Sequence, residues 1–586
     1  MSIRVVERNK GLFRILTFLV VILIVAATAI CCVGKKGFFL DELYSYGLSN
    51  SSYAPFVSYI KDGSINNTEY TQQELMAYLT VQEDEKFDYG SVYYNQTKDV
   101  HPPLFYFMLH TVSSLFPDVF SKWLGLSIGI IFFALTLAVL FLLVKALTLS
   151  RFASLLAVAL YGLSQIGLSD MLMIRMYMPL TFFTVLFAYL LVLICKDGIA
   201  DSSEKATILS QKASNWLFVI CGLVVFLGML TQYYFIFFSF FAFVCAIVFL
   251  LFQKQRKKAF TLFVGCALGF MVFLLFWSSF FNHLFADKLV SGTSAVESLF
   301  SFGRYPEQVG IFVGQLFVGE PIAFVLIIIA FVGWFIGCIL LRRSLSIVAK
   351  RRVSLVAFVI ALPVALSIVV VAVISPVNAV RYVYNIAPFI SCLAAVAVVY
   401  VVRLWAGKYT TEQVRDFSGA GLSTISFTSA YSDKIDDEMQ SRTIVLVLSV
   451  VIIVSLIATA ICTAKVTPSY THREFPQFDA KIEPYLDSPC LYVNDGYSAP
   501  ITTDILQLAQ FQNVFVSNLE DMSLVADYVD THAASDQLVV YMTINDFWTK
   551  AYDPSEVVSK LKEQFGYTEA VKLYRFGLSE SYVLTK

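Results

Sequence analysis

The sequence predicts an α-helical protein that crosses a membrane many times and ends in a small domain of mixed helices and strands. Hydrophobic residues make up 58% of its 586 residues, charged residues make up only 15%, and the mean hydropathy is +0.72. This composition is far more apolar than that of an ordinary soluble domain. From about residue 466 the long apolar runs stop, and the composition becomes that of a soluble domain. The net charge of −1 gives no reason to expect a nucleic acid partner.

The first apolar run, residues 12–33, is predicted to be a retained membrane helix. It is too long for a typical signal-peptide core and lacks an obvious small-residue cleavage site. Arg4, Arg8 and Lys10 precede it, so the positive-inside rule places the N-terminus in the cytoplasm. The first outside loop, residues 35–120, is polar and rich in tyrosine and acidic residues in its first two thirds.

An apolar segment near the end of this loop, residues 104–116, decides the topology. About 13 residues of helix reach only about 20 Å, which is short of the roughly 30 Å hydrocarbon core. Counting this segment as a span would also place most of the later lysine and arginine clusters outside, against the positive-inside rule. We therefore predict a juxtamembrane or re-entrant helix.

The later apolar runs bring the number of predicted spans to about eleven, an odd number that leaves the C-terminus outside. They lie near residues 123–144, 155–168, 177–194, 216–231, 234–252, 259–281, 317–341, 353–375, 381–402 and 443–464. Residues 403–442 are predicted to be a cytoplasmic loop. The chain thus divides into a transmembrane domain, residues 1–465, and an extracytoplasmic domain, residues 466–586. The protein is expected to be a multi-pass integral protein, of the plasma membrane if the host is a bacterium.

The extracytoplasmic domain shows alternating strand and helix patterns, which predict a small α/β fold. Strand-like runs occupy residues 490–493, 514–516, 538–542, 571–574 and 582–584, and helical stretches include residues 500–511 and 554–565. The domain has no glycine-rich phosphate loop and no histidine pair with metal-ligand spacing.

An acidic pair, Asp41 and Glu42, follows directly after the first predicted helix. Ionisable groups at a membrane boundary are functional candidates because desolvating a charge there is expensive. The simpler alternative is solvated polar surface at a helix end. The pair is therefore a candidate site that the rest of the outside face has to support.

Other polar residues are predicted to gather on the same outside face. His101 closes the first loop, Asp170 and Arg175 lie on the second, and Arg381 lies on a late tight turn. Carboxylates accept protons from hydroxyl groups, and arginines hold phosphates through paired hydrogen bonds. Together they favour a reaction on an anionic, lipid-linked substrate.

Each of these residues also has a structural alternative. His101 precedes two prolines and is equally suited to brace the turn, and Asp170 is suited to cap the next helix. Arg175 and Arg381 are suited to reach toward lipid headgroups with their long side chains. These alternatives stay open at the level of the sequence.

The acidic pair and the Asp-Val-His-Pro-Pro-Leu motif at residues 99–104 together resemble the protein O-mannosyltransferases and their bacterial relatives, including aminoarabinose transferases. Short motifs at residues 174–177 and 380–388 resemble further patterns of the bacterial members. The likeness covers about residues 10–400. It implies a GT-C fold and a glycosyltransferase, hexosyl or pentosyl, that uses a polyprenyl-phosphate sugar as its donor.

The resemblance also implies roles for individual residues. Asp41 corresponds to the catalytic carboxylate, here the general base of an inverting transfer to a hydroxyl acceptor, and Glu42 to its companion. Arg175 and Arg381 fit the arginines that hold the lipid phosphate. The expected partners are the bilayer, the donor lipid and a cell-envelope glycan, lipid or protein acceptor. The terminal α/β module is not the β-trefoil-type insertion of the eukaryotic enzymes, so it gives no basis for choosing a protein acceptor.

His101 and Asp170 are assigned to the acceptor side of the site. With Asp41 and Glu42 they also offer oxygen and nitrogen ligands suited to Mg²⁺ or Mn²⁺. The proteins that the chain resembles need no metal, so neither a metal nor another cofactor is predicted.

Two other classes of function compete with the transferase. A transporter or flippase of a lipid-linked or polar solute predicts charges near the middle of the membrane, often in paired repeats. A non-catalytic scaffold or sensor predicts a partner-binding terminal domain. Convergence of Asp41, Asp170, Arg175 and Arg381 on one outward-facing cavity would favour the transferase.

Overall fold

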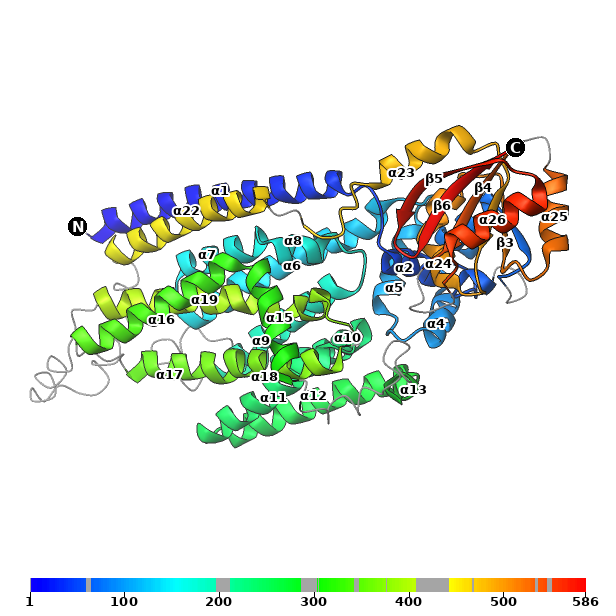
Figure 1. Ribbon diagram of the computed structural model, residues 1–586. Coiled ribbons are helices and arrows are strands. Elements are labelled where there is room, and N and C mark those ends of the chain that lie inside the picture. The colour runs from blue at the N-terminus through cyan, green and yellow to red at the C-terminus, as the bar shows by residue number, and fades with distance from the viewer. Residues whose placement is uncertain are drawn as a thin grey trace, which may run out of the picture.

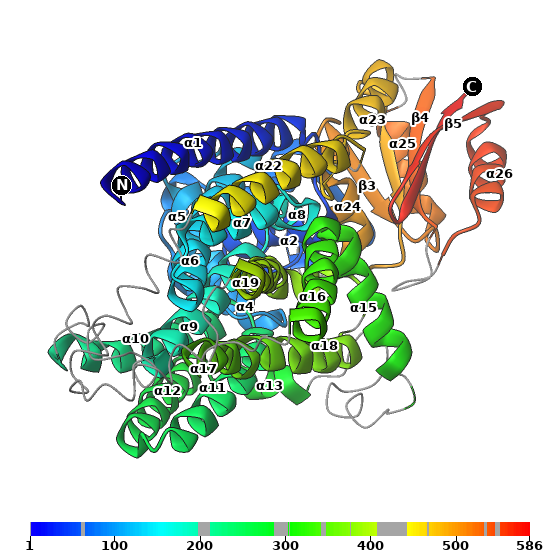
Figure 2. The same cartoon turned by 90° about the vertical axis from the view of Figure 1, so that its left-hand side faces the viewer.

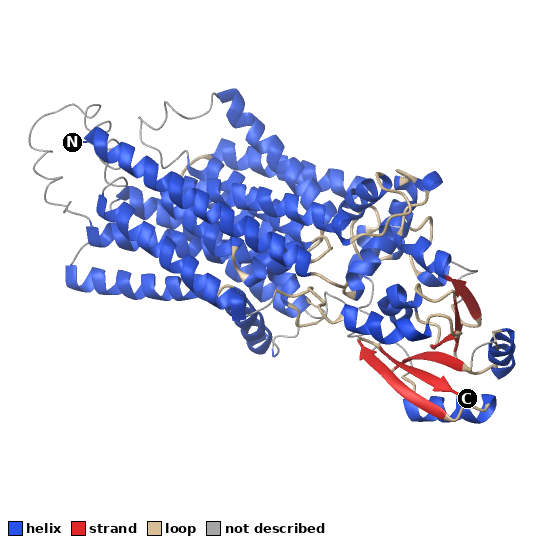
Figure 3. Cartoon of the chain, turned by 90° about the horizontal axis from the view of Figure 1, so that it is seen from above, coloured by secondary structure: helices blue, strands red, loops and turns tan. Residues whose placement is uncertain are grey.

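The computed structural model is predominantly helical, with one sheet at one end (Figure 3). It describes residues 2–59, 65–196, 211–285, 303, 305–341, 347–375, 377–406, 442–465, 468–532, 536–544 and 551–586. Most of the predicted cytoplasmic loop, residues 403–442, lies outside the described residues.

Long apolar helices form the membrane part. They are α1 (Ser2–Gly34), α6 (Lys122–Thr148), α9 (Tyr177–Lys196), α10 (Gln211–Thr231), α11 (Phe235–Phe252), α12 (Arg256–Phe276), α16 (Pro321–Leu341), α17 (Ile347–Val356) with η5 (Ala357–Ala361) and α18 (Leu362–Ile374), α19 (Ala387–Ala406) and α22 (Arg442–Lys465). Among the described residues, eight helices are long and apolar enough to cross a membrane. The helices α1 and α22, from opposite ends of the transmembrane domain, lie side by side (Figures 1 and 2).

The remaining predicted spans correspond to shorter or bent helices. The pair α7 (Arg151–Gly162) and α8 (Gln165–Leu172) is bent by 61° and forms a ninth candidate span if the two are counted together. Shorter apolar helices at residues 215–231 and 444–459 match two further predicted spans. Each apolar run identified in the sequence therefore forms an apolar helix.

Shorter elements connect the membrane helices. They are α2 (Leu40–Asn50), η1 (Val57–Tyr59), α3 (Gln72–Leu79), η2 (Glu83–Glu85), α4 (Tyr89–Lys98), α5 (Leu104–Ser114), α13 (Phe280–Phe285), α15 (Tyr305–Gly319) and η6 (Val380–Ile386). The segment that decided the topology forms α5, which has 11 residues and is too short to cross a bilayer. It packs against α2.

The C-terminal domain contains a six-stranded sheet with the strand order β1-β3-β2-β4-β6-β5. Its strands are β1 (Thr68–Thr71), β2 (Cys490–Val493), β3 (Asn513–Ser517), β4 (Gln537–Thr543), β5 (Glu569–Phe576) and β6 (Ser579–Thr585). The three central strands β3, β2 and β4 are parallel, and the outer pairings are antiparallel. The domain's helices are α23 (Phe475–Ile482), η7 (Glu483–Tyr485), α24 (Ser498–Leu508), α25 (Met522–Thr531) and α26 (Pro554–Phe565).

Strand β2 shows why the sheet is covered on both faces. All four of its residues are buried, as expected of a central strand in a parallel arrangement. Successive side chains point to opposite faces. Cys490 and Tyr492 join the cluster that includes Ile501 of α24, whereas Leu491 joins the cluster that includes Val525 of α25.

The edge strand β1 comes from the first outside loop, where the sequence analysis predicted no strand. It pairs antiparallel with β3, with Thr68 opposite Val516 and Thr71 opposite Asn513. A four-residue strand has little local signal, and it forms here because the sheet offers it a pairing edge. As a result, the loop after α1 and the C-terminal residues build one sheet at the end of the bundle opposite the N-terminus (Figure 1).

Candidate active site

The helix α2 places the acidic pair in its first turn. Glu42 is the third residue of the helix, and its Oε2 accepts a hydrogen bond of 2.8 Å from the backbone N–H of Phe39, the residue before the helix. This is one half of a capping box, and acidic groups in the first turn also complement the helix dipole. The cap formed by Glu42 thus fixes the start of α2, and with it the backbone position of Asp41.

Glu42 is part of a buried ion pair. Lys35 Nζ lies 2.9 Å from each of its carboxylate oxygens, and both side chains have an exposed fraction of 0%. Glu42 Oε1 also accepts a 2.8 Å hydrogen bond from the backbone N–H of Ile174. Both oxygens are thus engaged, and the carboxylate joins the start of α2 to the turn before α9.

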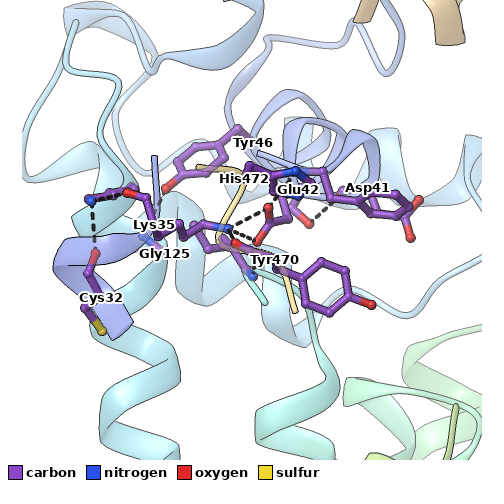
Figure 4. A network of polar contacts seen from close by, with 12 residues as sticks. Cys32, Lys35, Asp41, Glu42, Tyr46, Gly125, Tyr470 and His472 are labelled. Carbon is purple, nitrogen blue, oxygen red and sulfur yellow. Dashed lines mark hydrogen bonds and ion pairs between the residues drawn. The ribbon is translucent and has the colours of Figure 1, made fainter. Parts of the chain in front are cut away.

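Asp41 points in a different direction from its neighbour. Figure 4 shows Glu42 facing Lys35, with the Asp41 carboxylate on the side away from that pair. The Asp41 side chain is 23% exposed, and its Oδ2 lies 3.5 Å from Nη2 of Arg381, whose side chain is 15% exposed. The ion pair of Asp41 and Arg381 is therefore accessible to solvent, whereas the pair of Glu42 and Lys35 is not.

Arg381 lies on η6, where aromatic rings support its guanidinium. The group stands 5.5 Å from the ring centre of Phe39 and 5.2 Å from that of Tyr382. Arginine is attracted to the faces of aromatic rings in this way. Its Nε is buried and has no hydrogen-bond partner among the described residues. The rest of the side chain is partly exposed beside Asp41, so a ligand can approach the guanidinium from that side.

Arg175 lies deeper, in the turn between α8 and α9. It is only 6% exposed, and its Nη1 donates to the hydroxyls of Tyr106 at 2.9 Å and Ser45 at 3.4 Å. Ser45 donates in turn to the backbone oxygen of Asp41 at 3.1 Å. Arg175 also interacts electrostatically with the carboxylates of Asp41 and Asp99. It thus places a buried positive charge behind the acidic groups.

His101 is held by Asp99, which the sequence analysis did not select. The two side chains meet at 2.7 Å between Nδ1 and Oδ2, and both are partly buried. Burial acts to raise the pKa of Asp99, but the charge and hydrogen bond of His101, with Arg175, lower that pKa to about 2. Asp99 therefore stays ionised and fixes the imidazole. Its place two residues before His101, in the same motif, was the available signal.

Asp170 does not contact the Asp41–Arg381 pair directly. It lies inside α8, is 1% exposed, and accepts a 2.7 Å hydrogen bond from the hydroxyl of Thr181. The alternative that it caps the next helix is wrong, because α9 begins only at Tyr177. Its assignment to the acceptor side stays a prediction.

The four candidate metal ligands do not form a cluster. Within the described parts of the chain, no group of three or more His, Cys, Asp or Glu side chains is arranged to hold a metal ion. Asp41 pairs with Arg381, Glu42 with Lys35, and His101 with Asp99.

Tyr470, which no sequence motif singled out, lies on the segment leading into α23. Its ring centre is 5.7 Å from that of Phe39, and its side chain interacts with Arg381 and Tyr384. The backbone oxygen of Tyr470 accepts a hydrogen bond of 2.7 Å from Lys35 Nζ. The sequence gives no signal for these contacts, because Tyr470 is more than 400 residues away from Lys35 and Phe39 in the chain.

These features define a polytopic helical membrane protein with a carboxylate–arginine site between the bundle and an α/β domain. No family model and no curated protein matches the chain. Its structure is similar to ArnT from Cupriavidus metallidurans bound to undecaprenyl phosphate, with 13% identity, a TM-score of 0.48 and 97% of each chain covered. It is also similar to the oligosaccharyltransferase of Archaeoglobus fulgidus in the apo form, with 9% identity and a TM-score of 0.42, covering 89% of this chain and 69% of that one. At such low similarity, function has to be argued from the side chains.

Proposed function

We propose that the protein is a membrane glycosyltransferase that moves a sugar from a polyprenyl-phosphate donor to a hydroxyl acceptor on the extracytoplasmic face. The observation that carries this proposal is the partly exposed pair of Asp41 and Arg381, 3.5 Å apart. It sets a proton acceptor beside a phosphate-binding group, which are the two functions that such a transfer needs. The motif resemblance of the sequence supports the same reaction.

Asp41 is the general base of the proposed reaction. It takes the proton of the acceptor hydroxyl while the hydroxyl oxygen bonds to the anomeric carbon of the sugar. The bond between that carbon and the phosphate oxygen breaks, and its electron pair leaves with the polyprenyl phosphate. Such transfers pass through an oxocarbenium-like state, and direct displacement inverts the anomeric centre.

Arg381 holds the donor phosphate in this proposal. In the free protein it pairs with Asp41, and its side chain is partly exposed at that point. A guanidinium binds phosphate oxygens with charge-assisted, often paired, hydrogen bonds. It also stabilises the negative charge that grows on the departing phosphate.

Arg175 and Glu42 support the site from behind. The Nη1 of Arg175 is engaged by Tyr106 and Ser45, and its buried charge interacts electrostatically with Asp41 and Asp99. Both oxygens of Glu42 are engaged, so it acts by positioning α2 and with it Asp41. Among the two predicted arginines, Arg381 is therefore the one that we assign to direct phosphate contact.

His101 is the proposed acceptor-side group. With Nδ1 held by Asp99, its Nε2 is the atom available to a substrate hydroxyl. An imidazole oriented by a carboxylate keeps one tautomer and one direction, which favours the binding of a hydroxyl group. In this proposal it orients the acceptor toward Asp41.

A transfer assay with the purified protein tests the proposal. The protein is incubated in vesicles with labelled polyprenyl-phosphate sugars and extracted envelope fractions, and the labelled product is identified. We expect label to move to a hydroxyl-linked product with free polyprenyl phosphate released. Movement of intact donor across the vesicle membrane without any transfer would contradict the proposal and favour the transporter.

A further inference from the structure

Residues 468–474, which lead into α23, are hydrogen-bonded to elements on two sides of the candidate site. The backbone N–H of Ser469 donates to the hydroxyl of Ser169 on α8 at 3.0 Å. Thr471 accepts a 2.7 Å hydrogen bond on its backbone oxygen from the N–H of Lys36. These contacts, together with the one from Lys35 to Tyr470, attach residues 468–474 to both α8 and the junction of α1 and α2.

The backbone of this segment adopts an uncommon conformation at two side-chain-bearing residues. Tyr470 has φ of 66° and His472 has φ of 44°, both in the left-handed region. Residues other than glycine rarely occupy this region, and they persist there when surrounding contacts hold them. His472 stacks on Phe39 with ring centres 6.4 Å apart and an interplanar angle of 10°. The left-handed backbone at Tyr470 therefore sets the direction in which its side chain leaves the segment.

That direction brings Tyr470 to the phosphate-binding arginine. The Tyr470 ring packs against Phe39, the same ring over which the Arg381 guanidinium stands. Its hydroxyl interacts with Arg381. Figure 4 shows the Tyr470 side chain extending away from the Lys35–Glu42 pair, to which its backbone is attached.

We infer that Tyr470 is a positioning residue that holds Arg381 in the orientation in which it receives the donor phosphate. This inference rests on the proposed function. An arginine side chain has many rotamers, so a guanidinium that binds phosphate gains from groups that restrict it beforehand. The guanidinium stands over the rings of Phe39 and Tyr382. Tyr470 packs against the same Phe39 ring, and its hydroxyl interacts with Arg381. The segment that leads into the extracytoplasmic domain thus completes the site.

The test is the full-length Tyr470→Phe variant, which removes one hydroxyl and keeps the ring. We expect the KM for the donor to rise by about tenfold with a smaller change in kcat, because the Tyr470 hydroxyl orients Arg381 before the donor binds and the cost of ordering that side chain is therefore met at the binding step. Tyr567→Phe, which alters a buried tyrosine between α26 and β5, is the matched control and should leave both constants unchanged. Thermal unfolding of each variant reports whether the fold is retained.

A double-mutant cycle separates positioning from a general loss of stability. Arg381→Lys keeps the charge but loses the planar group that Tyr470 restricts. If Tyr470 acts through Arg381, Tyr470→Phe should add little further increase in donor KM in that background. Additive effects, or an unchanged donor KM in Tyr470→Phe alone, would overturn the inference. Absence of any transfer by the wild type would instead overturn the proposed function.

Discussion

Asp41 and Glu42 are neighbours of the same chemical type, but the structure uses them in different ways. Glu42 is fully buried against Lys35 and accepts two backbone hydrogen bonds, whereas Asp41 is partly exposed beside Arg381. The sequence identifies the pair but not this division, because burial depends on Ile174 and Tyr470, which are distant in the chain. Similar reasoning separates the buried Arg175 from the more accessible Arg381.

The Glu42→Gln variant should lose stability rather than chemistry alone. It leaves the Lys35 ammonium buried without its counter-charge, and breaking a buried pair in this way costs about 3–5 kcal/mol. Thermal unfolding in detergent measures the loss. The double variant Lys35→Met with Glu42→Gln should recover part of it, because the buried charge is removed. A single variant as stable as the wild type would contradict a structural role for the pair.

The Arg381→Ala variant should weaken the use of the donor. Loss of a charge-assisted phosphate contact costs about 1.5–3 kcal/mol, so kcat/KM for the donor should fall by about tenfold or more. Arg575→Ala, which changes an exposed arginine paired with Glu580 on the sheet, is the control. Steady-state kinetics with varied donor provide the measurement. An unchanged kcat and donor KM would remove Arg381 from the site.

At the scale of elements, local patterns predict the helices and most of the strands. The runs at residues 490–493 and 538–542 became β2 and β4, because β-branched and aromatic residues in short apolar runs fit a covered sheet. Strand β1 escaped prediction, because its sequence carries no comparable run and its position depends on β3. The hydrogen bond between Ser469 and Ser169 of α8 could not be predicted either, because it too depends on tertiary packing.

The C-terminal domain contains a buried acid, Asp504, whose titration should make its stability depend on pH. Asp504 on α24 is fully buried, and Tyr492 donates to its Oδ2 at 2.9 Å. Burial raises the pKa of Asp504 from 3.8 to about 7, although hydrogen bonds from Ser579 and Tyr492 act in the opposite direction. The stabilising effect of the neutral acid is therefore complete below pH 3.8 and is lost as the pH rises through about 7.

The wild-type protein should therefore become less stable by about 1.4 kcal/mol between pH 6 and pH 8 through this residue. Asp504→Asn keeps the shape without the titration, so that part of the pH dependence should disappear. Unfolding of the sheet domain by denaturant at several pH values measures the difference. Identical pH profiles for the two proteins would show that Asp504 does not titrate as described.

At the scale of the whole molecule, the composition and the charge pattern predict a helical membrane protein with a terminal α/β domain. The structure agrees, and it adds that the loop after α1 contributes an edge strand to that domain. The site lies where α2, η6 and the segment before α23 meet, so it joins the beginning, middle and end of the chain. Such a convergence is a property of the packing, and single-sequence patterns do not contain it.

If Asp41 is the base of the sugar transfer, the Asp41→Asn variant should lose turnover while it keeps its fold. Sugar transfer from a polyprenyl-phosphate donor is measured with the purified wild type, Asp41→Asn and the control Asp84→Asn, an exposed acid of the same outside loop. We expect a loss of at least about a hundredfold in kcat for Asp41→Asn with the fold retained, and none for Asp84→Asn. Turnover by Asp41→Asn within a few-fold of the wild type would contradict this role of Asp41.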